Sequence, residues 1–419
     1  MMRLDLFKVK NTVLLFVLAL ISCGNFSQTD QVKKVQSQEI KILQEAQFEK
    51  NIIVGANRTE LYLPLLKDKK VGIVANQTSV IFKNKEQNKY THLVDSLLDL
   101  NIAIKKVFSP EHGFRGTADA GELVSDGVDI KTGLPIVSLH GKSKKPPNEK
   151  LIDIDVIIFD IQDVGVRFYT YISTLHYIME SCAENNIPLI ILDRPNPNGH
   201  YVDGPTLNIE HQSFLGMHPI PLVHGMTIGE MAKMINGENW LNNGIQCEIT
   251  IIPINNYTHQ ISYSLPIRPS PNLPNDQSIK LYPSLGLFEG TNINAGRGTE
   301  FQFQRYGSPF LNPETMTFTY TPESNFGSKY PKHKGELCYG EDLSNEKIEG
   351  MTLKWVITAY ENSIDKSLFF LTNGFTKHAG STELQKQIEA GLSEAEIRQT
   401  WTKDLETYKT MRLQYLMYQ

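Results

Sequence analysis

The sequence predicts a Rossmann-like α/β domain with a doubly wound, mostly parallel sheet, followed by a smaller α+β domain. Two observations predict the first domain: short runs rich in Val and Ile recur from about residue 50, and segments with helical periodicity lie between them. Strands that are apolar on both faces suit a sheet covered by helices on both sides. The third observation is the length of 419 residues, which favours two domains over a single core.

The expected elements alternate along the first half of the chain. We expect strands at 70–75, 102–108, 135–139, 156–159, 189–192 and 247–253, and helices at 92–100, 174–183 and 227–235. The last of these helices begins with Thr227 as its N-cap and has Glu230 three residues later, the pattern of a capping box.

A proline-rich segment at 265–274 separates the two expected domains, because its prolines are incompatible with a helix or a central strand. We therefore place the α/β domain at 49–262 and the α+β domain at 263–419. Arg268, Ser270 and Asn272 of the connecting segment are also expected to be able to line a cleft.

The first 23 residues have the pattern of an export signal, with basic residues before an apolar run at 13–20 that is short for a membrane span. Leu20-Ile21-Ser22-Cys23 resembles a bacterial lipobox, which predicts cleavage before Cys23 and lipidation of its thiol. The alternative is a general secretory signal in which Cys23 is incidental. Residues 24–48 are expected to be a tether. The sequence thus predicts an exported protein in the periplasm, bound to the membrane through lipid only.

Composition and missing motifs exclude several classes of protein. A net charge of −5 provides no basic surface for nucleic acid. Three cysteines remain beside Cys23, an odd number without C-x-x-C spacing, which argues against a disulfide scaffold and a zinc knuckle. The sequence has no G-x-G-x-x-G dinucleotide motif, no phosphate loop and no G-x-S-x-G elbow. We therefore expect neither a cofactor nor a bound metal.

Polar side chains follow four of the expected strands, at the point where each strand ends. Because the carboxyl ends of parallel strands meet at one edge of a sheet, these clusters are expected to converge there and bind a polyhydroxylated ligand. The expected substrate-binding residues at this edge are Asn76, Gln77, His112, Arg115, Asp160, Gln162, Asp163, Arg167, Tyr169, Asp193, Arg194, Asn196 and Asn198. The alternative for Asp160 or Asp193 alone is that it caps the following turn.

Glu111, in the segment Ser-Pro-Glu-His-Gly-Phe-Arg-Gly at 109–116, is the leading candidate for a catalytic acid. Glycoside hydrolysis normally needs a proton donor and a second carboxylate that acts as base or nucleophile. Glu122, Asp160 and Asp163 compete for the second role. In the second domain, Glu289 and Arg297 lie in glycine-rich surroundings and are expected to close over the cleft, or to form a salt bridge at a turn.

These segments, in this order, resemble a bacterial family of exo-β-N-acetylmuramidases that was once a domain of unknown function. The segments that carry the resemblance are 75–79, 108–116, 159–171, 192–199, 203–205, 216–221, 269–274 and 287–291. The resemblance covers roughly residues 50–419. It implies a Rossmann-like domain joined to a smaller domain, with the active site in the cleft between them.

The resemblance also implies the reaction, which is release of N-acetylmuramic acid from the non-reducing ends of peptidoglycan fragments. The family's two glutamates fall on Glu111 and Glu122, and Arg115 or Arg167 would meet the lactyl carboxylate of the sugar. Two alternatives stay open. One is a lipoprotein that binds cell-wall sugars without catalysis, and the other is a metal-dependent hydrolase that uses Glu111, His112, Asp160 and Asp193, although no metal-ligand spacing supports it.

Overall fold

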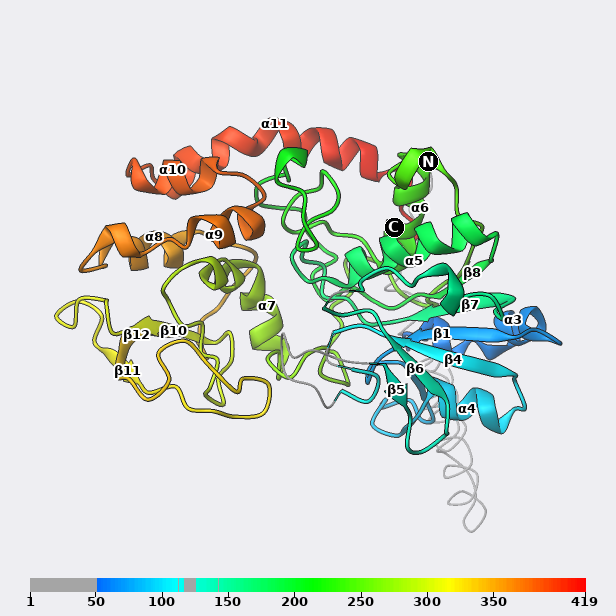
Figure 1. The fold of residues 1–419 in the computed structure, drawn as a ribbon. Helices are drawn as coiled ribbons and strands as arrows, with labels where there is room; N and C mark the ends of the chain where they lie inside the picture. Colours follow the sequence, from blue (N-terminus) through cyan, green and yellow to red (C-terminus); the bar gives the residue numbers. More distant parts are fainter. Residues whose placement is uncertain (1–50, 112, 117–125, 142) are drawn as a thin grey trace, which may run out of the picture. The chain divides into compact units, whose positions relative to one another are not determined.

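Seven short strands form the central sheet of the computed structural model (Figure 1), in the order β5-β6-β4-β1-β7-β8-β9. Their bounds are β1 Val71–Ala75, β4 Ile104–Ser109, β5 Gly127–Val128, β6 Pro135–Ser138, β7 Val156–Asp160, β8 Leu189–Leu192 and β9 Ile249–Ile252. All pairings are parallel except that of the edge strand β5 with β6. The expected parallel sheet is therefore confirmed, with an antiparallel edge that the sequence pattern did not indicate.

The structure describes residues 51–111, 113–116, 126–141 and 143–419. The export signal expected at 1–23 and the tether expected at 24–48 therefore lie outside the described residues. The described residues from Ile52 to Gln419 form one compact unit. Within the described chain, none of the helices combines the length and apolar character needed to cross a bilayer.

The central strands of the sheet bury alternate side chains in two different hydrophobic clusters. In β7, Val156 and Ile158 pack on one face of the sheet, and Ile157 and Phe159 pack on the other. This is why the strands are apolar throughout rather than alternating: both faces are covered by helices. Burial of each such side chain contributes roughly 1.5–3 kcal/mol to folding.

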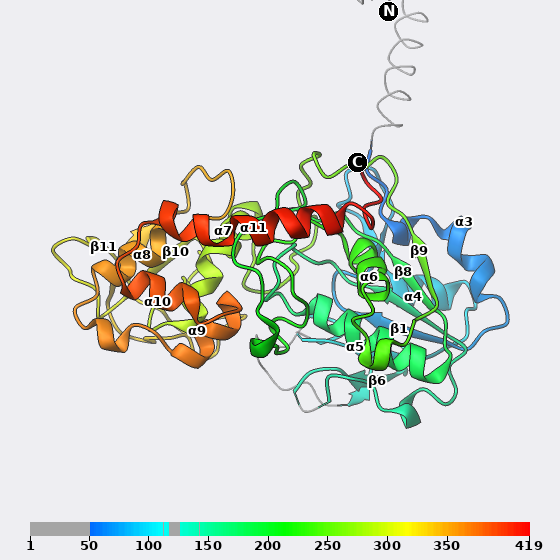
Figure 2. The ribbon, with the colours of Figure 1, turned by 90° about the horizontal axis from the view of Figure 1, so that it is seen from above.

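Helices cover both faces of the sheet, as Figures 1 and 2 show. On one face lie α5 Tyr171–Asn185 and α6 Ile228–Gly237, and on the other lie α3 Thr59–Tyr62 and α4 Leu93–Asp99. The predicted capping box of α6 is confirmed, because the Thr227 side chain accepts from the backbone of Glu230 and the Glu230 side chain accepts from the backbone of Thr227. A hairpin of β2 Val80–Phe82 and β3 Tyr90–His92 follows β1.

The chain after the proline-rich segment forms a smaller α+β region. Its elements are α7 Asp276–Leu285, β10 Arg305–Ser308, β11 Phe318–Tyr320, β12 Cys338–Asp342, α8 Lys354–Glu361, α9 Thr372–Ala379, α10 Glu383–Glu389 and α11 Glu394–Arg412. The three strands form an antiparallel sheet in the order β10-β12-β11. The hydrophobic cluster beneath α5 and α6 continues into this region without interruption.

The last helix carries the chain back to the larger sheet (Figure 2). From α11, the Tyr408 hydroxyl donates to the His224 carbonyl over 2.9 Å. Beyond the helix, the Tyr418 hydroxyl donates to the Asp193 carboxylate at the end of β8 over 2.7 Å. The C-terminal segment is therefore part of the support of the sheet edge where β8 ends.

A buried ion pair also stabilises this edge. Asp160, at the end of β7, is fully buried, and its carboxylate accepts from Arg194 Nε at 2.6 Å and Nη2 at 2.9 Å. Arg194 follows β8 and also donates to the Val80 carbonyl of the hairpin at 3.0 Å. The ion pair thus connects the ends of β7 and β8, and through Arg194 it also connects them to the hairpin.

We expect the substitution Asp160→Asn to lower the free energy of unfolding by about 3–5 kcal/mol, because it leaves a buried guanidinium without its counter-charge. Urea denaturation followed by circular dichroism measures this loss. The matched control is Asp153→Asn, whose pair with Lys106 at 2.7 Å has a half-exposed carboxylate and is worth less than about 1 kcal/mol. Equal losses in the two variants would contradict the prediction.

Candidate active site

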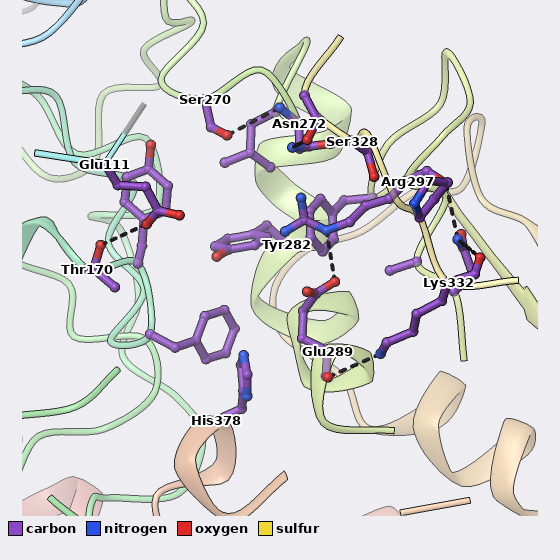
Figure 3. A pocket seen from close by; sticks show the side chains of 18 of the residues that line it. Glu111, Thr170, Ser270, Asn272, Tyr282, Glu289, Arg297, Ser328, Lys332 and His378 are labelled. Atoms are coloured by element: carbon purple, nitrogen blue, oxygen red, sulfur yellow. Dashed lines mark hydrogen bonds and ion pairs between the residues drawn. The ribbon is translucent and has the colours of Figure 1, made fainter. Parts of the chain in front are cut away.

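A cavity of about 760 Å³ lies where the loops that follow the sheet strands meet the C-terminal region (Figure 3). This volume is in the range of sites for small ligands. The described residues that line it are Glu111, 168–171, Leu215, Ser270, Asn272, Leu273, Tyr282, Glu289, Asn294, Ala295, Arg297, Phe303, 327–332 and His378. Segments from both regions therefore contribute to its wall.

Glu111 projects into the cavity from the loop that follows β4. The Thr170 hydroxyl, at the entrance to α5, donates to Glu111 Oε2 over a long distance of 3.5 Å. Figure 3 shows the Glu111 carboxylate on the wall opposite Glu289 and Arg297. A carboxyl group in this position is able to exchange a proton with a ligand in the cavity.

Aromatic side chains form much of the wall. Phe168, Tyr169, Tyr171, Tyr282 and Phe303 pack edge to face in a chain, with ring centroids 4.8–5.9 Å apart. Burial raises the pKa of each of the three tyrosines, so their hydroxyls stay protonated at neutral pH. Neutral aromatic faces of this kind offer the apolar surface on which a sugar ring can stack.

Glu289 and Arg297 form an ion pair on the opposite wall, where Arg297 Nε donates to Glu289 Oε1 at 3.0 Å. Burial opposes the charged forms of both groups, but their mutual attraction outweighs it. The pKa of Glu289 is therefore lowered, with Lys332 and His378 adding to the effect of Arg297, and the pKa of Arg297 is raised. Both groups carry their charges at neutral pH.

Lys332 holds the turn that carries Glu289. Its ammonium donates to the carbonyl oxygens of Phe288, Glu289, Thr291 and Ile293 at 2.8, 3.1, 2.7 and 3.4 Å. These carbonyls lie in and just beyond the 3₁₀ turn Gly286–Gly290. Burial lowers the pKa of Lys332, while the Glu289 carboxylate raises it. The lysine thus takes the place of backbone donors that this irregular segment lacks.

The structure brings four of the sequence-predicted site residues to the cavity wall: Glu111, Tyr169, Glu289 and Arg297. Glu289 and Arg297 make the salt bridge that the sequence left as their alternative role, and both also line the cavity. Ser270 and Asn272 of the proline-rich segment line it as well, whereas Arg268 does not.

Asn76 and Gln77 lie one layer behind the wall. Asn76 Nδ2 donates to the Tyr171 hydroxyl at 2.9 Å, and Gln77 Nε2 donates to the carbonyls of Arg268 and Pro269 at 3.3 and 3.1 Å. These amides fix the aromatic wall and the proline-rich segment instead of facing the cavity.

Gln162, Asn196 and Asn198 likewise bind backbone carbonyls behind the wall. Gln162 Nε2 donates to the carbonyls of Asp163 and Pro195, Asn196 to that of Met226, and Asn198 to those of Val164 and Ile279. Gly165 makes room for this network: its φ is +78°, and a Cβ there would lie 2.3 Å from Asn196 Oδ1. The amides therefore connect the loops that end the strands.

The three aspartates of this edge are buried and do not line the cavity. Asp160 pairs with Arg194, and Asp163 accepts from the Gly165 amide at 2.7 Å. Asp193 accepts from the Thr227 hydroxyl at 2.7 Å and from the Gly229 amide at 2.9 Å, so it binds the start of α6, which is remote in the sequence from the turn that follows Asp193. Burial raises the pKa of Asp193 to about 6.

Neither arginine that we expected to meet a lactyl carboxylate lines the cavity. Arg115 is bonded to the carboxylates of Asp95 and Asp129, with Nη2 distances of 3.0 and 2.7 Å. Arg167 is fully buried and donates to four backbone carbonyls, among them those of His378 and Ala379. Burial lowers the pKa of Arg167 to about 9, so its guanidinium remains charged at neutral pH.

Two predicted residues, His112 and Glu122, lie outside the described residues, as does Cys23. Within the described chain, the His, Cys, Asp and Glu side chains form no group of three or more that would hold a metal ion. Cys182, Cys247 and Cys338 are buried free thiols.

Sequence reasoning missed several residues of the wall, including Phe168, Thr170, Tyr282, Lys332 and His378. Phe168 packs against both Tyr282 and His378, with ring centroids 5.2 and 5.3 Å apart. Phe168 and Thr170 stand beside predicted residues, so their position was a usable signal. Lys332 and His378 come from remote segments, and no sequence motif marks them.

Comparison with known proteins gives matches along almost the whole described chain. Family models described as "Exo-beta-N-acetylmuramidase NamZ, N-terminal" and "Exo-beta-N-acetylmuramidase NamZ, C-terminal" match residues 71–277 and 280–418. The peptidoglycan β-N-acetylmuramidase NamZ of Bacillus subtilis is 39% identical over 377 residues, which are 85% of this chain and 89% of that protein.

Two solved structures of DUF1343 family proteins from Bacteroides fragilis are also similar. One has a TM-score of 0.80 at 45% identity and covers 88% of this chain and 99% of its own. The other has a TM-score of 0.74 at 27% identity and covers 88% of this chain and 100% of its own. The arrangement of the sheet and the smaller region is thus shared with crystal structures.

We expect Lys332→Met to lower the free energy of unfolding by about 2–4 kcal/mol, because it leaves four carbonyl oxygens without their charged donor. Thermal and urea denaturation measure the effect. Lys334→Met is the control on the same segment, since Lys334 is exposed and has no hydrogen-bond partner among the described residues. A loss below about 1 kcal/mol would show that water replaces the ammonium.

Proposed function

The chain belongs to the NamZ exo-β-N-acetylmuramidase family, and from this membership we propose that it releases N-acetylmuramic acid from the non-reducing ends of peptidoglycan fragments. The observation that carries the proposal is the position of Glu111, a carboxylic acid on the wall of an aromatic cavity of about 760 Å³. Its substrates are muramyl saccharides derived from peptidoglycan.

Glu111 is the general acid in this proposal. Cleavage of a glycosidic bond leaves a sugar alkoxide unless a proton reaches the leaving oxygen in the transition state, and a positioned carboxylic acid supplies it. Thr170 limits the orientation of the acid through its hydroxyl. Proton transfer leaves Glu111 as a carboxylate, which has to regain a proton before the next turnover.

Glu122 is the second carboxylate in this proposal. Among the competitors, the Asp160 carboxylate is bonded to Arg194, and Asp163 is buried behind the wall. Glu289 lines the cavity but is ion-paired with Arg297. Glu122 follows Glu111 by only eleven positions, so it belongs to the same stretch of chain after β4.

The aromatic wall binds the sugar rings in this proposal. Tyr169 and Tyr171 lie on the same side as Glu111, and Tyr282 and Phe303 belong to the C-terminal region. The tyrosine hydroxyls offer acceptor oxygens for ligand hydroxyl groups, and so does Oδ1 of Asn272, whose Nδ2 donates to the Gly327 carbonyl at 2.7 Å. Stacking provides affinity and these polar atoms provide orientation.

We expect Glu111→Gln to reduce kcat on a muramyl disaccharide by about 10²- to 10⁴-fold. On 4-nitrophenyl β-N-acetylmuramide we expect a loss at least about ten-fold smaller, because nitrophenolate is a good leaving group that needs little protonation. Steady-state kinetics on both substrates measure the difference. Glu149→Gln, at an exposed glutamate that does not line the cavity, is the control.

Two outcomes would contradict the assignment of Glu111. Unimpaired turnover in the variant would show that Glu111 is not the acid, and an equal loss on both substrates would show that it acts on another step. A wild-type protein that binds muramyl sugars but cleaves neither substrate would favour the binding lipoprotein instead.

We also propose that the protein is exported and held on the periplasmic side of a bacterial membrane by a lipid on Cys23. The support is the apolar run at 13–20 and the Leu20–Cys23 lipobox pattern. A single thioether-linked diacylglycerol with an acylated amino terminus would provide more than one chain, as stable anchoring requires.

We expect wild-type protein to incorporate labelled palmitate when it is expressed in a bacterium that processes lipoproteins, and Cys23→Ala to incorporate none. Gel autoradiography of the membrane fraction measures this. Cys182→Ala, at a buried thiol of α5, is the control and keeps its label. Unlabelled wild-type protein in the soluble periplasmic fraction would indicate a general secretory signal instead.

A further inference from the structure

A muramic acid site has to recognise a carboxylate. N-acetylmuramic acid differs from N-acetylglucosamine by the lactyl ether on its ring, and this group ends in a carboxylate at neutral pH. A site that distinguishes the two sugars therefore needs a cation with unused donors at the cavity wall. Among the described residues of the wall, the arginines and lysines are Arg297, Lys329 and Lys332.

The two lysines fit this role poorly. An ammonium has three N–H donors, and that of Lys332 already serves four carbonyl oxygens. Lys329 is exposed, so water competes for its charge. Neither lysine provides the two parallel N–H donors with which a buried guanidinium binds both oxygens of a carboxylate.

Arg297 has the geometry of a carboxylate receptor. Only its Nε is used by Glu289, at 3.0 Å, and its two Nη groups make no hydrogen bond to another part of the described chain. The guanidinium lies 5.0 Å from the centroid of the Phe303 ring, and about a fifth of the side chain is exposed. Figure 3 shows the guanidinium beside Glu289, on the side that faces Glu111. The ion pair with Glu289 and the Phe303 ring hold the Arg297 guanidinium in one orientation before a ligand binds.

The charges on this wall also favour one anion. Arg297 and Lys332 are cations and Glu289 is an anion, so the group has one positive charge in excess. A single lactyl carboxylate neutralises it. N-acetylglucosamine would leave the two Nη groups of Arg297 without an acceptor in a partly dehydrated place, which costs affinity.

We propose that Arg297 recognises the lactyl carboxylate of N-acetylmuramic acid through its two Nη groups, and that Glu289 is the positioning residue that orients it. This inference rests on the proposed muramidase function. It names the residue that sets the choice of sugar, in place of Arg115 and Arg167, whose donors are bonded elsewhere.

The test is a cycle of enzyme variants and substrates. The substrates are 4-nitrophenyl β-N-acetylmuramide, the same compound with its lactyl acid converted to an N-methylamide, and 4-nitrophenyl β-N-acetylglucosaminide. We expect Arg297→Gln to lower kcat/KM on the free acid by about 10- to 100-fold and on the two uncharged substrates by less than about 3-fold. Arg297→Lys should recover part of the loss, because an ammonium keeps the charge without the fork.

Two further variants separate positioning from structure. Glu289→Ala should lower the ratio of kcat/KM for acid over amide, mainly through KM, and Glu289→Gln should restore most of it, because its amide oxygen accepts the same hydrogen bond. Arg305→Gln is the matched control: this arginine packs on Phe301 and pairs with Asp342 in the same region but does not line the cavity. Its acid-to-amide ratio should equal that of the wild type.

Equal losses on the acid and the amide in Arg297→Gln would overturn the inference, and so would unchanged kinetics. If Arg297→Gln does not fold, as judged by circular dichroism, the test uses Arg297→Lys and compares its ratio of kcat/KM for acid over amide with that of the wild type. If the wild type cleaves none of the substrates, the proposed function fails by itself. Calorimetric titration with N-acetylmuramic acid and N-acetylglucosamine then still tests the role of Arg297. If Arg297→Gln loses the wild-type preference for N-acetylmuramic acid, the inference is supported. If the variant keeps this preference, the inference is overturned.

Discussion

The guanidinium of Arg167 connects the sheet region to the C-terminal region beside the cavity. Its Nη1 donates to the carbonyls of Pro205 and Ile220 at 2.7 and 2.8 Å, and its Nη2 donates to those of His378 and Ala379 at 3.1 and 2.7 Å. The position of Phe168, the next residue, follows from these bonds, and Phe168 in turn packs against Tyr282 and His378. The buried guanidinium of Arg167 therefore holds the two walls of the cavity together through four backbone carbonyl groups.

Most polar residues at the strand ends bind other parts of the protein and do not line the cavity. A strand end that enters a loop exposes backbone carbonyls, and a buried loop has to satisfy them within the protein. Gln162, Asn196 and Asn198 perform this task, and Asp160 and Arg194 satisfy each other. The wall itself is then left to aromatic rings and a few charged groups, which the polar layer behind them holds in place.

This distinction explains what the sequence could and could not predict. The parallel sheet, its polar edge and the capping box of α6 were predictable, because each depends on local patterns of apolar, polar and capping residues. The pattern also placed Glu111, Tyr169, Glu289 and Arg297 among the candidates that line the cavity. The sequence pattern could not distinguish a side chain that lines the cavity from one that binds a backbone carbonyl. Tyr169 and Asn196 both follow strand ends, but Tyr169 lines the cavity and Asn196 binds the Met226 carbonyl. Lys332 and His378 reach the wall through long-range packing, which leaves no local signal.

The contacts of Arg167 also bear on the order in which the molecule is built. Arg167 is 211 residues from His378 and 212 from Ala379, and Asp193 is 225 residues from Tyr418. Closing such long loops costs more chain entropy than pairing neighbouring strands of the sheet, so we expect these contacts to form after the sheet does. Until His378 and Ala379 have packed against it, Arg167 lacks half of its acceptors. A chain that ends before His378 lacks both these acceptors and part of the cavity wall.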